Sequence, residues 1–447
     1  MTYKNYFKDK RITLMGLGLL GRGVGDAKFL AEHCKELIVT DLKSKEELKS
    51  SLVQLKKYSN ITYRLSEHNL EDFQGRDLIV KSAGVPLQTI YTDEATKNGI
   101  PITMSTSLFA KFAPVTTIGI TGTKGKSTTT HLIHHVLRAT GMNVHLGGNV
   151  LGVSTLAMLP LVTTGDIVVL ELDSWQLQGF HAEKLSPHIA VFTNFMEDHM
   201  NYYNGDMDAY FYDKSAIFSY QSKHDTLITT KDIITIAKKL NIQIAAKLKL
   251  SCNTQNQTKH TLPFLPGDHN QKNAEQAHLA LQTLGVPESE ITKHFATATA
   301  LPGRLELVAS KNSIDFYNDT NATIPDATIT SLKTLTAMKK DITLITGGTF
   351  KDVDVTKYAK LLPNFVTKLI LLEGSGTNKL LETGIAIPYT IHNSLSEAFN
   401  EAVKNTTQDK NNTILLSPAF SSFGMFKNEY DRGAQFNALV KNYLSAQ

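Results

Sequence analysis

The sequence predicts an α/β protein built of three domains. Short runs of apolar and β-branched residues alternate with helical stretches along the chain, which is typical of parallel sheets covered by helices. At 447 residues the chain is too long for one compact core. Turn residues at positions 301–303 (LPG) mark one boundary. We therefore expect domains over residues 1–104, 105–302 and 303–447.

The composition excludes several classes of protein. Hydrophobic residues make up 41% and charged residues 20%, as in an ordinary folded protein rather than a disordered one. The net charge of +4 is too small for a surface that coats nucleic acid. Cys34 and Cys252 lie far apart, so we expect neither a disulfide framework nor a zinc site. The N-terminus is polar and no apolar run approaches ~18 residues, so we expect a cytoplasmic protein without membrane contact.

The first domain opens with a strand and a glycine-rich turn, residues 16–21 (GLGLLG), followed by a helix. This G-x-G-x-x-G pattern indicates a Rossmann-like domain, although it is weak evidence alone. A second turn at residues 82–86 (SAGVP) can hold a pyrophosphate through its backbone N–H groups. Strands are predicted at residues 12–15, 37–40 and 77–80.

The central domain carries the most informative stretch, residues 122–130 (GTKGKSTTT). It lies between a strand and the start of a helix, a geometry that aims backbone N–H groups and the positive helix end at phosphate oxygens. Lys126 can neutralise the outer phosphates, and the Ser127 hydroxyl can reach Mg²⁺. Ile120 stands where the standard P-loop has its first glycine, yet the strand context favours phosphate binding over a chance turn. Strands are predicted at residues 117–121, 167–171 and 189–193, and a helix at 127–140.

The last domain repeats the alternation of strands and helices. Each of its strands ends in Gly, Ser or Glu and precedes a helical pattern, which again indicates a parallel α/β sheet and a Rossmann-like domain. The predicted strands are residues 342–346, 368–372 and 413–417.

The phosphate loop and the stretches that follow it resemble the Mur ligase family. The loop has the form G-T-x-G-K-[ST], which folylpolyglutamate synthases share. Residues 170–177 (LELDSWQL) resemble the family's E-x-S-S-[FW]-Q-L stretch, and residues 193–200 (TNFMEDHM) resemble N-x-x-x-D-H-[ML]. Three further family motifs follow in order within residues 265–323. The resemblance covers essentially the whole chain and implies a central domain of the P-loop ATPase type.

The resemblance implies ATP and two Mg²⁺ ions as cofactors. The family's metal ligands match Ser127, Glu171, His199 and Lys214, of which the lysine is carbamylated by CO₂ in the family. A carboxylate at the carboxyl end of a strand beside a phosphate loop suits a hard cation. Asp173 stands where the family usually has serine and adds a negative charge near the metal.

The same resemblance assigns the remaining contacts of ATP. Two asparagines match those that face adenine, Arg304 matches a residue that contacts a phosphate when the domains close, and Asp319 matches a ribose contact. The implied ATP-binding residues are Gly122, Thr123, Lys124, Gly125, Lys126, Ser127, Thr128, Asn270, Asn273, Arg304 and Asp319. The implied catalytic residues are Lys126, His199, Lys214 and Arg304.

The first domain resembles the uridine pocket of the family members that add D-glutamate. Asp41, at the end of the second strand, matches the acid that contacts uracil, and residues 82–86 match S-P-G-[IV]-P. The implied residues that bind the UDP substrate are Leu19, Leu20, Asp41, Ser82, Ala83, Gly84 and Asn149.

Residues 416–436 resemble the C-terminal motif of the same members. Lys351 and Ser422 match residues that hold the glutamate carboxylates, which a lysine and a hydroxyl suit physically. The implied amino-acid-binding residues are Thr323, Lys351, Ser422 and Phe423. Three departures weaken the attraction for a dianionic amino acid: Asn321 in place of lysine, Gly424 in place of aspartate and Glu429 where an aromatic residue is common.

The resemblance implies ATP-dependent ligation of glutamate, with D-glutamate preferred, to UDP-N-acetylmuramoyl-L-alanine through an acyl phosphate, in peptidoglycan precursor synthesis. A monomer that binds no nucleic acid is expected. The departures leave L-glutamate or a neutral amino acid open as acceptors. A folylpolyglutamate-type ligase is an alternative, but it lacks the N-terminal nucleotide-sugar domain. A nucleotide-sensing module is a third possibility, against which the implied metal ligands argue, because a sensor does not need them.

Overall fold

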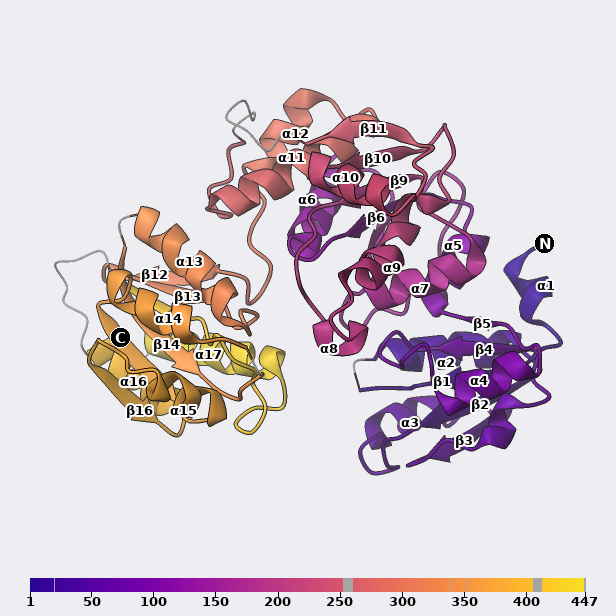
Figure 1. Ribbon diagram of the computed structural model, residues 1–447, viewed down its shortest axis with the longest axis horizontal. Coiled ribbons are helices and arrows are strands. Elements are labelled where there is room, and N and C mark those ends of the chain that lie inside the picture. Colours follow the sequence, from indigo (N-terminus) through magenta and orange to yellow (C-terminus); the bar gives the residue numbers. More distant parts are fainter. Residues whose placement is uncertain (20, 252–259, 339, 352, 405–411, 446–447) are drawn as a thin grey trace. The chain divides into compact units, whose positions relative to one another are not determined.

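The computed structural model describes residues 1–447 except 20, 252–259, 339, 352, 405–411 and 446–447 (Figure 1). The chain forms two compact units. Unit 1 contains Met1–Thr261 and Asp268–Phe295, and unit 2 contains Leu262–Gly267 and Ala296–Gln447. Unit 1 holds two sheets and unit 2 holds one, so the α/β architecture predicted from the strand pattern is confirmed. The domain limits at residues 104 and 302 stay predictions.

The first sheet of unit 1 has five parallel strands in the order β3-β2-β1-β4-β5. The predicted strands at residues 12–15, 37–40 and 77–80 correspond to β1, β2 and β4. The two edge strands, β3 and β5, were not predicted, because β3 alternates apolar and polar residues instead of forming an apolar run and β5 has only two residues. The elements are α1 (Tyr3–Phe7), β1 (Arg11–Met15), α2 (Arg22–His33), β2 (Glu36–Asp41), α3 (Lys49–Leu55), β3 (Ile61–Leu65), β4 (Leu78–Lys81), α4 (Ile90–Lys97) and β5 (Ile102–Thr103).

The second sheet of unit 1 has six parallel strands in the order β11-β10-β9-β6-β8-β7. Its central strands, β6, β8 and β9, are the three predicted from apolar runs, since strands buried on both faces are continuously hydrophobic. The elements are α5 (Ser105–Phe112), β6 (Thr116–Thr121), α6 (Lys126–Ala139), β7 (Val144–Gly148), β8 (Ile167–Glu171), α7 (Ser174–Glu183), β9 (Ile189–Phe192), α8 (Met200–Tyr203), α9 (Met207–Ser219), β10 (Thr226–Thr229), α10 (Lys231–Lys239), β11 (Lys247–Leu250), α11 (Asp268–Thr283) and α12 (Glu288–Phe295).

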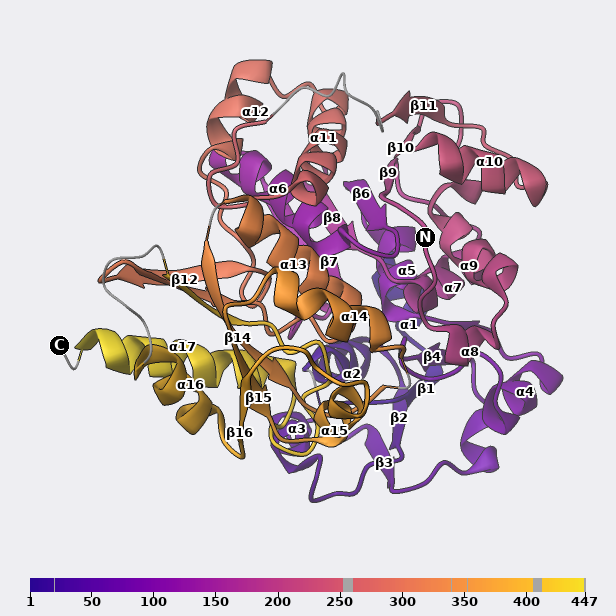
Figure 2. The ribbon, with the colours of Figure 1, turned by 60° about the vertical axis from the view of Figure 1, so that its left-hand side comes forward.

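Unit 2 contains a six-stranded sheet in the order β12-β13-β17-β14-β15-β16. β12 pairs antiparallel with β13, and the other strand pairs are parallel. Two apolar clusters flank this sheet: one includes residues of α13 and α14, the other residues of α16 and α17. Figure 2 shows these four helices around the sheet. The elements are β12 (Glu306–Lys311), β13 (Ile314–Asn318), α13 (Pro325–Ala337), β14 (Asp341–Gly347), α14 (Thr356–Leu361), β15 (Lys368–Leu372), α15 (Ser375–Glu382), β16 (Tyr389–His392), α16 (Leu395–Lys404), β17 (Asn412–Leu416) and α17 (Glu429–Ser445).

The parallel topology determines where functional side chains can gather. The carboxyl ends of parallel strands meet at one edge of a sheet, where the following loops converge. In the second sheet, the loops after β6, β8 and β9 therefore lie at one edge, and β6 pairs with both of the other strands. Within the described part of the chain, no helix has the length and apolarity needed to span a membrane.

Candidate active site

The phosphate loop connects β6 to α6 and depends on two glycines. Gly122 has φ +140° and Gly125 has φ +85°, conformations that residues with a side chain rarely adopt. A Cβ atom on Gly122 would lie 2.0 Å from the Thr193 Oγ1, and one on Gly125 would lie 2.3 Å from the Asn273 Oδ1. Gly125 is the N-cap of the 14-residue helix α6. The loop therefore lies at a helix N-terminus, where backbone N–H groups and the helix dipole attract phosphate.

A second segment, which directly follows β9, holds the phosphate loop in place. The Thr123 backbone N–H donates to the Asn194 carbonyl oxygen at 2.9 Å, and that of Lys124 donates to the Asn194 Oδ1 at 2.9 Å. The Asn194 Nδ2 and the Thr193 hydroxyl both donate to the Lys124 carbonyl oxygen. Asn194 has no role predicted from the sequence. Its only signal was its place at the start of the family-like motif after a buried strand.

Two lysine side chains meet at the same carbonyl of this loop. The Lys126 Nζ donates to the Gly122 and Thr123 carbonyl oxygens, at 3.0 and 3.1 Å. The Lys214 Nζ, on α9, donates to the Gly122 carbonyl oxygen at 3.0 Å. Two residues predicted to act together, 88 positions apart in sequence, are thus neighbours in space.

Lys214 is buried, with 1% of its surface exposed. Burial lowers its pKa well below the usual lysine range, and the adjacent Lys126 lowers it further, against the opposing charges of Asp173 and Asp198. A lowered pKa favours the neutral amine. Because a neutral amine is the nucleophile that captures CO₂, this environment suits carbamylation.

Glu171 lies at the carboxyl end of β8, buried and next to β6 and β7. The Asn149 backbone N–H donates to its carbonyl oxygen at 2.7 Å. Asp173, two residues on, caps α7: its Oδ1 accepts from the Gln176 backbone N–H at 2.7 Å. The structural role of Asp173 as an N-cap was not foreseen, although Asp is a favoured N-cap residue.

His199 begins α8 with a left-handed backbone, φ +57°. Its ring packs 4.8 Å from that of Trp175, and its Nε2 lies 3.9 Å from the Asp198 Oδ1. Burial lowers the pKa of His199, and nearby Lys214 and Lys126 lower it too, although Asp198 opposes them. The imidazole is therefore favoured in its neutral form, the form that can bind a metal.

The donor set fits a hard cation only in part. Among the described residues, no three His, Cys, Asp or Glu side chains converge to hold a metal by themselves. Ser127, in the first turn of α6, and Glu171 supply oxygen, the ligand type that Mg²⁺ prefers. Further oxygens must come from a carbamylated Lys214, the nucleotide phosphates or water.

The glycine-rich turn of the first sheet is built around Asp41. Its Oδ2 accepts from the Leu17 and Gly18 backbone N–H groups, both at 2.8 Å, and its Oδ1 accepts from that of Lys43 at 2.9 Å. This carboxylate thus organises the turn, while its contact with uracil stays a prediction. Leu19 beside it is 57% exposed, and Leu20 lies outside the described residues.

The predicted pyrophosphate turn adjoins this glycine-rich turn. A Cβ atom on Gly16 would lie 2.9 Å from the Ser82 Cβ, which brings the ends of β1 and β4 together. Ser82 and Ala83 are half-buried and Gly84 is exposed. The buried Lys81 ammonium donates to the Val85 carbonyl oxygen at 2.6 Å and so stabilises the turn. Sequence analysis did not identify Lys81.

In unit 2, Asp319 is buried, and both of its carboxylate oxygens accept hydrogen bonds. Its Oδ2 accepts from the Ser331 and Ser417 hydroxyls, at 2.6 and 2.7 Å, and its Oδ1 accepts from the Leu305 backbone N–H at 3.0 Å. Burial raises its pKa to about 6 despite these bonds. Asp319 therefore organises the loop after β13, and its contact with ribose stays a prediction. Arg304, beside Leu305, is exposed.

The predicted amino-acid-binding residues of unit 2 lie on three loops. The Lys351 Nζ donates to the Thr323 hydroxyl at 3.2 Å, which brings two of them together. Ser422 is buried and Phe423 is 63% exposed. Of the departures, the Asn321 Nδ2 donates to the Pro302 carbonyl oxygen at 3.2 Å.

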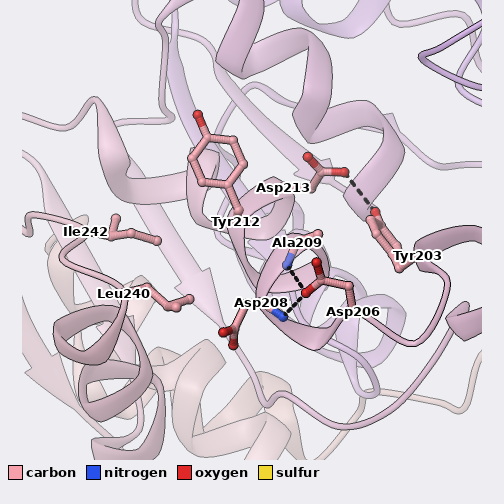
Figure 3. A pocket seen from close by; sticks show the side chains of 8 residues that line it. All are labelled: Tyr203, Asp206, Asp208, Ala209, Tyr212, Asp213, Leu240 and Ile242. Atoms are coloured by element: carbon pink, nitrogen blue, oxygen red, sulfur yellow. Dashed lines mark hydrogen bonds between the residues drawn. The ribbon is translucent and has the colours of Figure 1, made fainter.

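A surface pocket of about 340 Å³ lies at the start of α9 (Figure 3). Tyr203, Tyr212 and Leu240 are among its lining residues. The Asp206 carboxylate accepts hydrogen bonds from the Asp208 and Ala209 backbone N–H groups of α9. The Asp213 carboxylate accepts a hydrogen bond from the Tyr203 hydroxyl at 2.9 Å. None of the predicted site residues lines this pocket, which is distinct from the phosphate loop.

Comparison with known proteins identifies relatives over the full length. Residues 120–286 match the model of the Mur ligase middle domain. The chain is 34% identical to UDP-N-acetylmuramoylalanine–D-glutamate ligase of Borreliella burgdorferi, over 97% of this chain and 98% of the relative. It is 30% identical to the ligase of the same name from Treponema pallidum, with 97% and 98% covered. The MurF ligase of Thermotoga maritima, solved in complex with ADP, shares the fold with a TM-score of 0.61, at 14% identity and with 100% of both chains covered.

Proposed function

The chain belongs to the Mur ligase family of ATP-dependent, amide-bond-forming ligases, and we propose that it joins D-glutamate to UDP-N-acetylmuramoyl-L-alanine in peptidoglycan synthesis. The observation that carries the proposal is the phosphate loop with Lys126 and Lys214 at one carbonyl, in a chain related over its full length to D-glutamate ligases. That full-length relationship also argues against a folylpolyglutamate-type ligase and against a sensor without catalysis.

The reaction begins with a poor electrophile, the carboxylate of the UDP-linked alanine. Transfer of the γ-phosphoryl group of ATP to this carboxylate gives an acyl phosphate and ADP. The amine of glutamate, as a free base, attacks the acyl carbon, and phosphate leaves from the tetrahedral intermediate. The products are the amide and inorganic phosphate, and the proton that the amine nitrogen loses goes to phosphate or to water.

Residues of the phosphate loop act on the first step. Lys126 and the backbone N–H groups from Gly122 to Thr128 stabilise the charge that gathers on the transferring phosphoryl group. Mg²⁺, when bound by Ser127, Glu171, His199 and a carbamylated Lys214, would supply further charge neutralisation. We assign Asn270, Asn273, Arg304 and Asp319 to the nucleotide, as the family resemblance implies.

The remaining loops are assigned to the binding of the other two substrates, the UDP-linked substrate and glutamate. We assign the UDP-linked substrate to Asp41, Leu19, Leu20, the turn at residues 82–84 and Asn149. Glutamate is assigned to Thr323, Lys351, Ser422 and Phe423. We further propose that the protein acts in the cytoplasm as a monomer, without membrane or nucleic-acid partners. Its small net charge of +4 supports the last point.

The experiment that tests this function measures ADP release with UDP-N-acetylmuramoyl-L-alanine present. D-glutamate, L-glutamate and neutral amino acids are supplied in turn, because Asn321, Gly424 and Glu429 alter the charge expected of a glutamate pocket. We expect ADP release and amide product with D-glutamate. Turnover with L-glutamate alone would change the acceptor, and turnover only with a pterin substrate would overturn the assignment.

A further inference from the structure

Arg22, the first residue of α2, touches the loop that follows β7 in the second sheet. Its Nη1 donates to the Asn149 Oδ1 at 2.7 Å, between residues 127 positions apart. Sequence analysis and the proposed function give Arg22 no role. Asn149, by contrast, is assigned to the UDP-linked substrate, and its backbone is hydrogen-bonded to Glu171, an implied metal ligand at the phosphate loop.

The two segments around this contact are packed closely enough to fix its geometry. The Ser154 hydroxyl donates to the Asp26 Oδ1 at 2.5 Å. A Cβ atom on Gly25 would lie 2.4 Å from the Ser154 Cβ, so only glycine permits this approach. Arg22 therefore reaches Asn149 from a helix whose next turn is bonded to the same loop.

The backbone of Asn149 is fixed independently of Arg22. Its N–H donates to the Glu171 carbonyl oxygen at 2.7 Å, and the preceding Gly148 N–H donates to the Thr155 hydroxyl at 2.8 Å. Arg22 therefore determines the orientation of the Asn149 side-chain amide and not the position of its backbone. A primary amide has one acceptor oxygen and one NH₂ donor group on opposite sides. With the oxygen facing the guanidinium, the NH₂ group faces the other way.

We propose that Arg22 is a positioning residue that holds the Asn149 amide with its NH₂ group toward the UDP-linked substrate. This inference rests on the proposed function and deepens it. The NH₂ group donates to an oxygen of the substrate carboxylate and then of the acyl phosphate. Without Arg22 the amide can rotate by half a turn and present its oxygen, which repels an anionic oxygen. The glycine-rich turn of the UDP-binding sheet and the reacting end of the substrate are thereby linked through one hydrogen bond.

The test is a double-mutant cycle between Arg22 and Asn149 in the full-length protein. Arg22→Met should lower kcat roughly 10- to 100-fold, the scale of a misplaced contact at a reacting centre. The KM of the UDP substrate and its affinity, measured by calorimetry without ATP, should change much less. In an Asn149→Ala background, Arg22→Met should have no further effect on kcat, because there is no amide left to orient.

Two further variants test whether Arg22 orients the Asn149 amide or merely joins α2 to the loop after β7. Asn149→Asp keeps an oxygen for Arg22 but lacks the NH₂ donor, so its kcat should fall as far as that of Asn149→Ala while thermal stability is kept. Arg22→Lys retains a donor and should recover part of the kcat. The matched control is Lys28→Met, which removes a cation from the same helix, where the Lys28 ammonium donates to the exposed Gln54 side chain at 2.9 Å.

The outcomes distinguish this inference from the function on which it rests. If Arg22→Met lowers kcat by the same factor with and without Asn149, or behaves like Lys28→Met, Arg22 does not position the amide. In that case the ligase assignment stands, because the wild-type protein still forms the amide. If the wild-type protein releases no ADP with any amino acid, the proposed function fails and this inference fails with it.

Discussion

At the residue scale, the site depends on two lysines that share one hydrogen-bond acceptor. Lys126 and Lys214 both donate to the Gly122 carbonyl oxygen, and Lys214 is almost fully buried there. Burial penalises a charged amine, and a second cation beside it adds to the penalty, so the pKa of Lys214 falls. Lys126 is only half-buried. Two lysines with the same hydrogen-bond partner thus differ in what they can do.

Replacing Lys126 by alanine should abolish ligation. The loss of its charge at the transferring phosphoryl group should lower kcat by roughly 100- to 1,000-fold or more. Binding of the UDP substrate, measured by calorimetry, should be retained. Lys231→Ala, on the exposed start of α10, is the control for removing a lysine. Near-normal turnover of Lys126→Ala would contradict the mechanism.

Activity should depend on CO₂ through Lys214. In buffer freed of CO₂ the wild-type rate should fall, and bicarbonate should restore it. A carbamate carbon should be visible by NMR after loading with ¹³C-bicarbonate, and it should be absent in Lys214→Arg, whose guanidinium does not form it. An unchanged rate without CO₂, together with no carbamate signal, would show that Lys214 acts as a plain amine.

At the element scale, unit 2 joins two functional loops through one buried arginine. Arg432, on α17, is fully buried. Its Nε and Nη2 donate to the Thr320 hydroxyl and carbonyl oxygens, at 3.1 and 2.9 Å, and its Nη1 donates to the Phe420 carbonyl oxygen at 3.3 Å. Thr320 belongs to the loop after β13 and Phe420 to the loop after β17, which carries Ser422. Burial lowers the pKa of Arg432 to about 10, although the charge of Glu429 opposes the shift.

Arg432→Met should therefore weaken both the fold of unit 2 and the binding of the amino acid. Two buried carbonyl oxygens would lose their donor, at about 1–3 kcal/mol each. The KM of the amino acid should rise while that of the UDP substrate stays unchanged. Arg432→Lys should not restore either property, because an ammonium cannot reproduce the planar fork of donors. Urea denaturation and steady-state kinetics, with the exposed Lys441→Met as control, check this.

At the scale of the whole molecule, the two sheets of unit 1 share one hydrophobic core. A single cluster of buried residues includes Leu30 of α2, Leu108 of α5 and Leu156 from the loop after β7. The bond from Ser154 to Asp26 lies within the same junction, where Asp26 is buried. Burial raises the pKa of Asp26 to about 6, against the hydrogen bond from Ser154. The junction between the sheets therefore contains a carboxyl group that favours protonation.

The stability of unit 1 should depend on pH through the titration of Asp26. Its folded pKa of about 6 exceeds the usual 3.8, so the folded state binds the proton more tightly. Its contribution to stability is complete below about pH 4 and is lost as the pH rises through 6. Relative to the wild type, Asp26→Asn should gain up to about 3 kcal/mol in the free energy of unfolding between pH 4 and pH 7. Urea denaturation across that range tests this, with the exposed Asp232→Asn as control. A constant difference between Asp26→Asn and the wild type would contradict it.

The α/β class, the central strands and the phosphate loop are predictable from the sequence alone, because these features depend on local patterns. Apolar runs of strand length identify β1, β6, β8 and β17, and glycines with a lysine before a helix identify the loop. The sequence also pointed to Lys214, His199 and Glu171, although only through family resemblance, since an isolated lysine or histidine carries no chemical signal.

The contacts between these residues follow from the three-dimensional fold and not from local sequence. Asn194 as the support of the phosphate loop, Asp41 as the centre of the glycine-rich turn and the burial of Arg432 all depend on partners distant in sequence. The bond of Arg22 to Asn149 spans 127 positions. Local pattern fixes which elements form, because backbone hydrogen bonds and side-chain periodicity are short-range. Sheet topology fixes which loops adjoin, and therefore which side chains can act together.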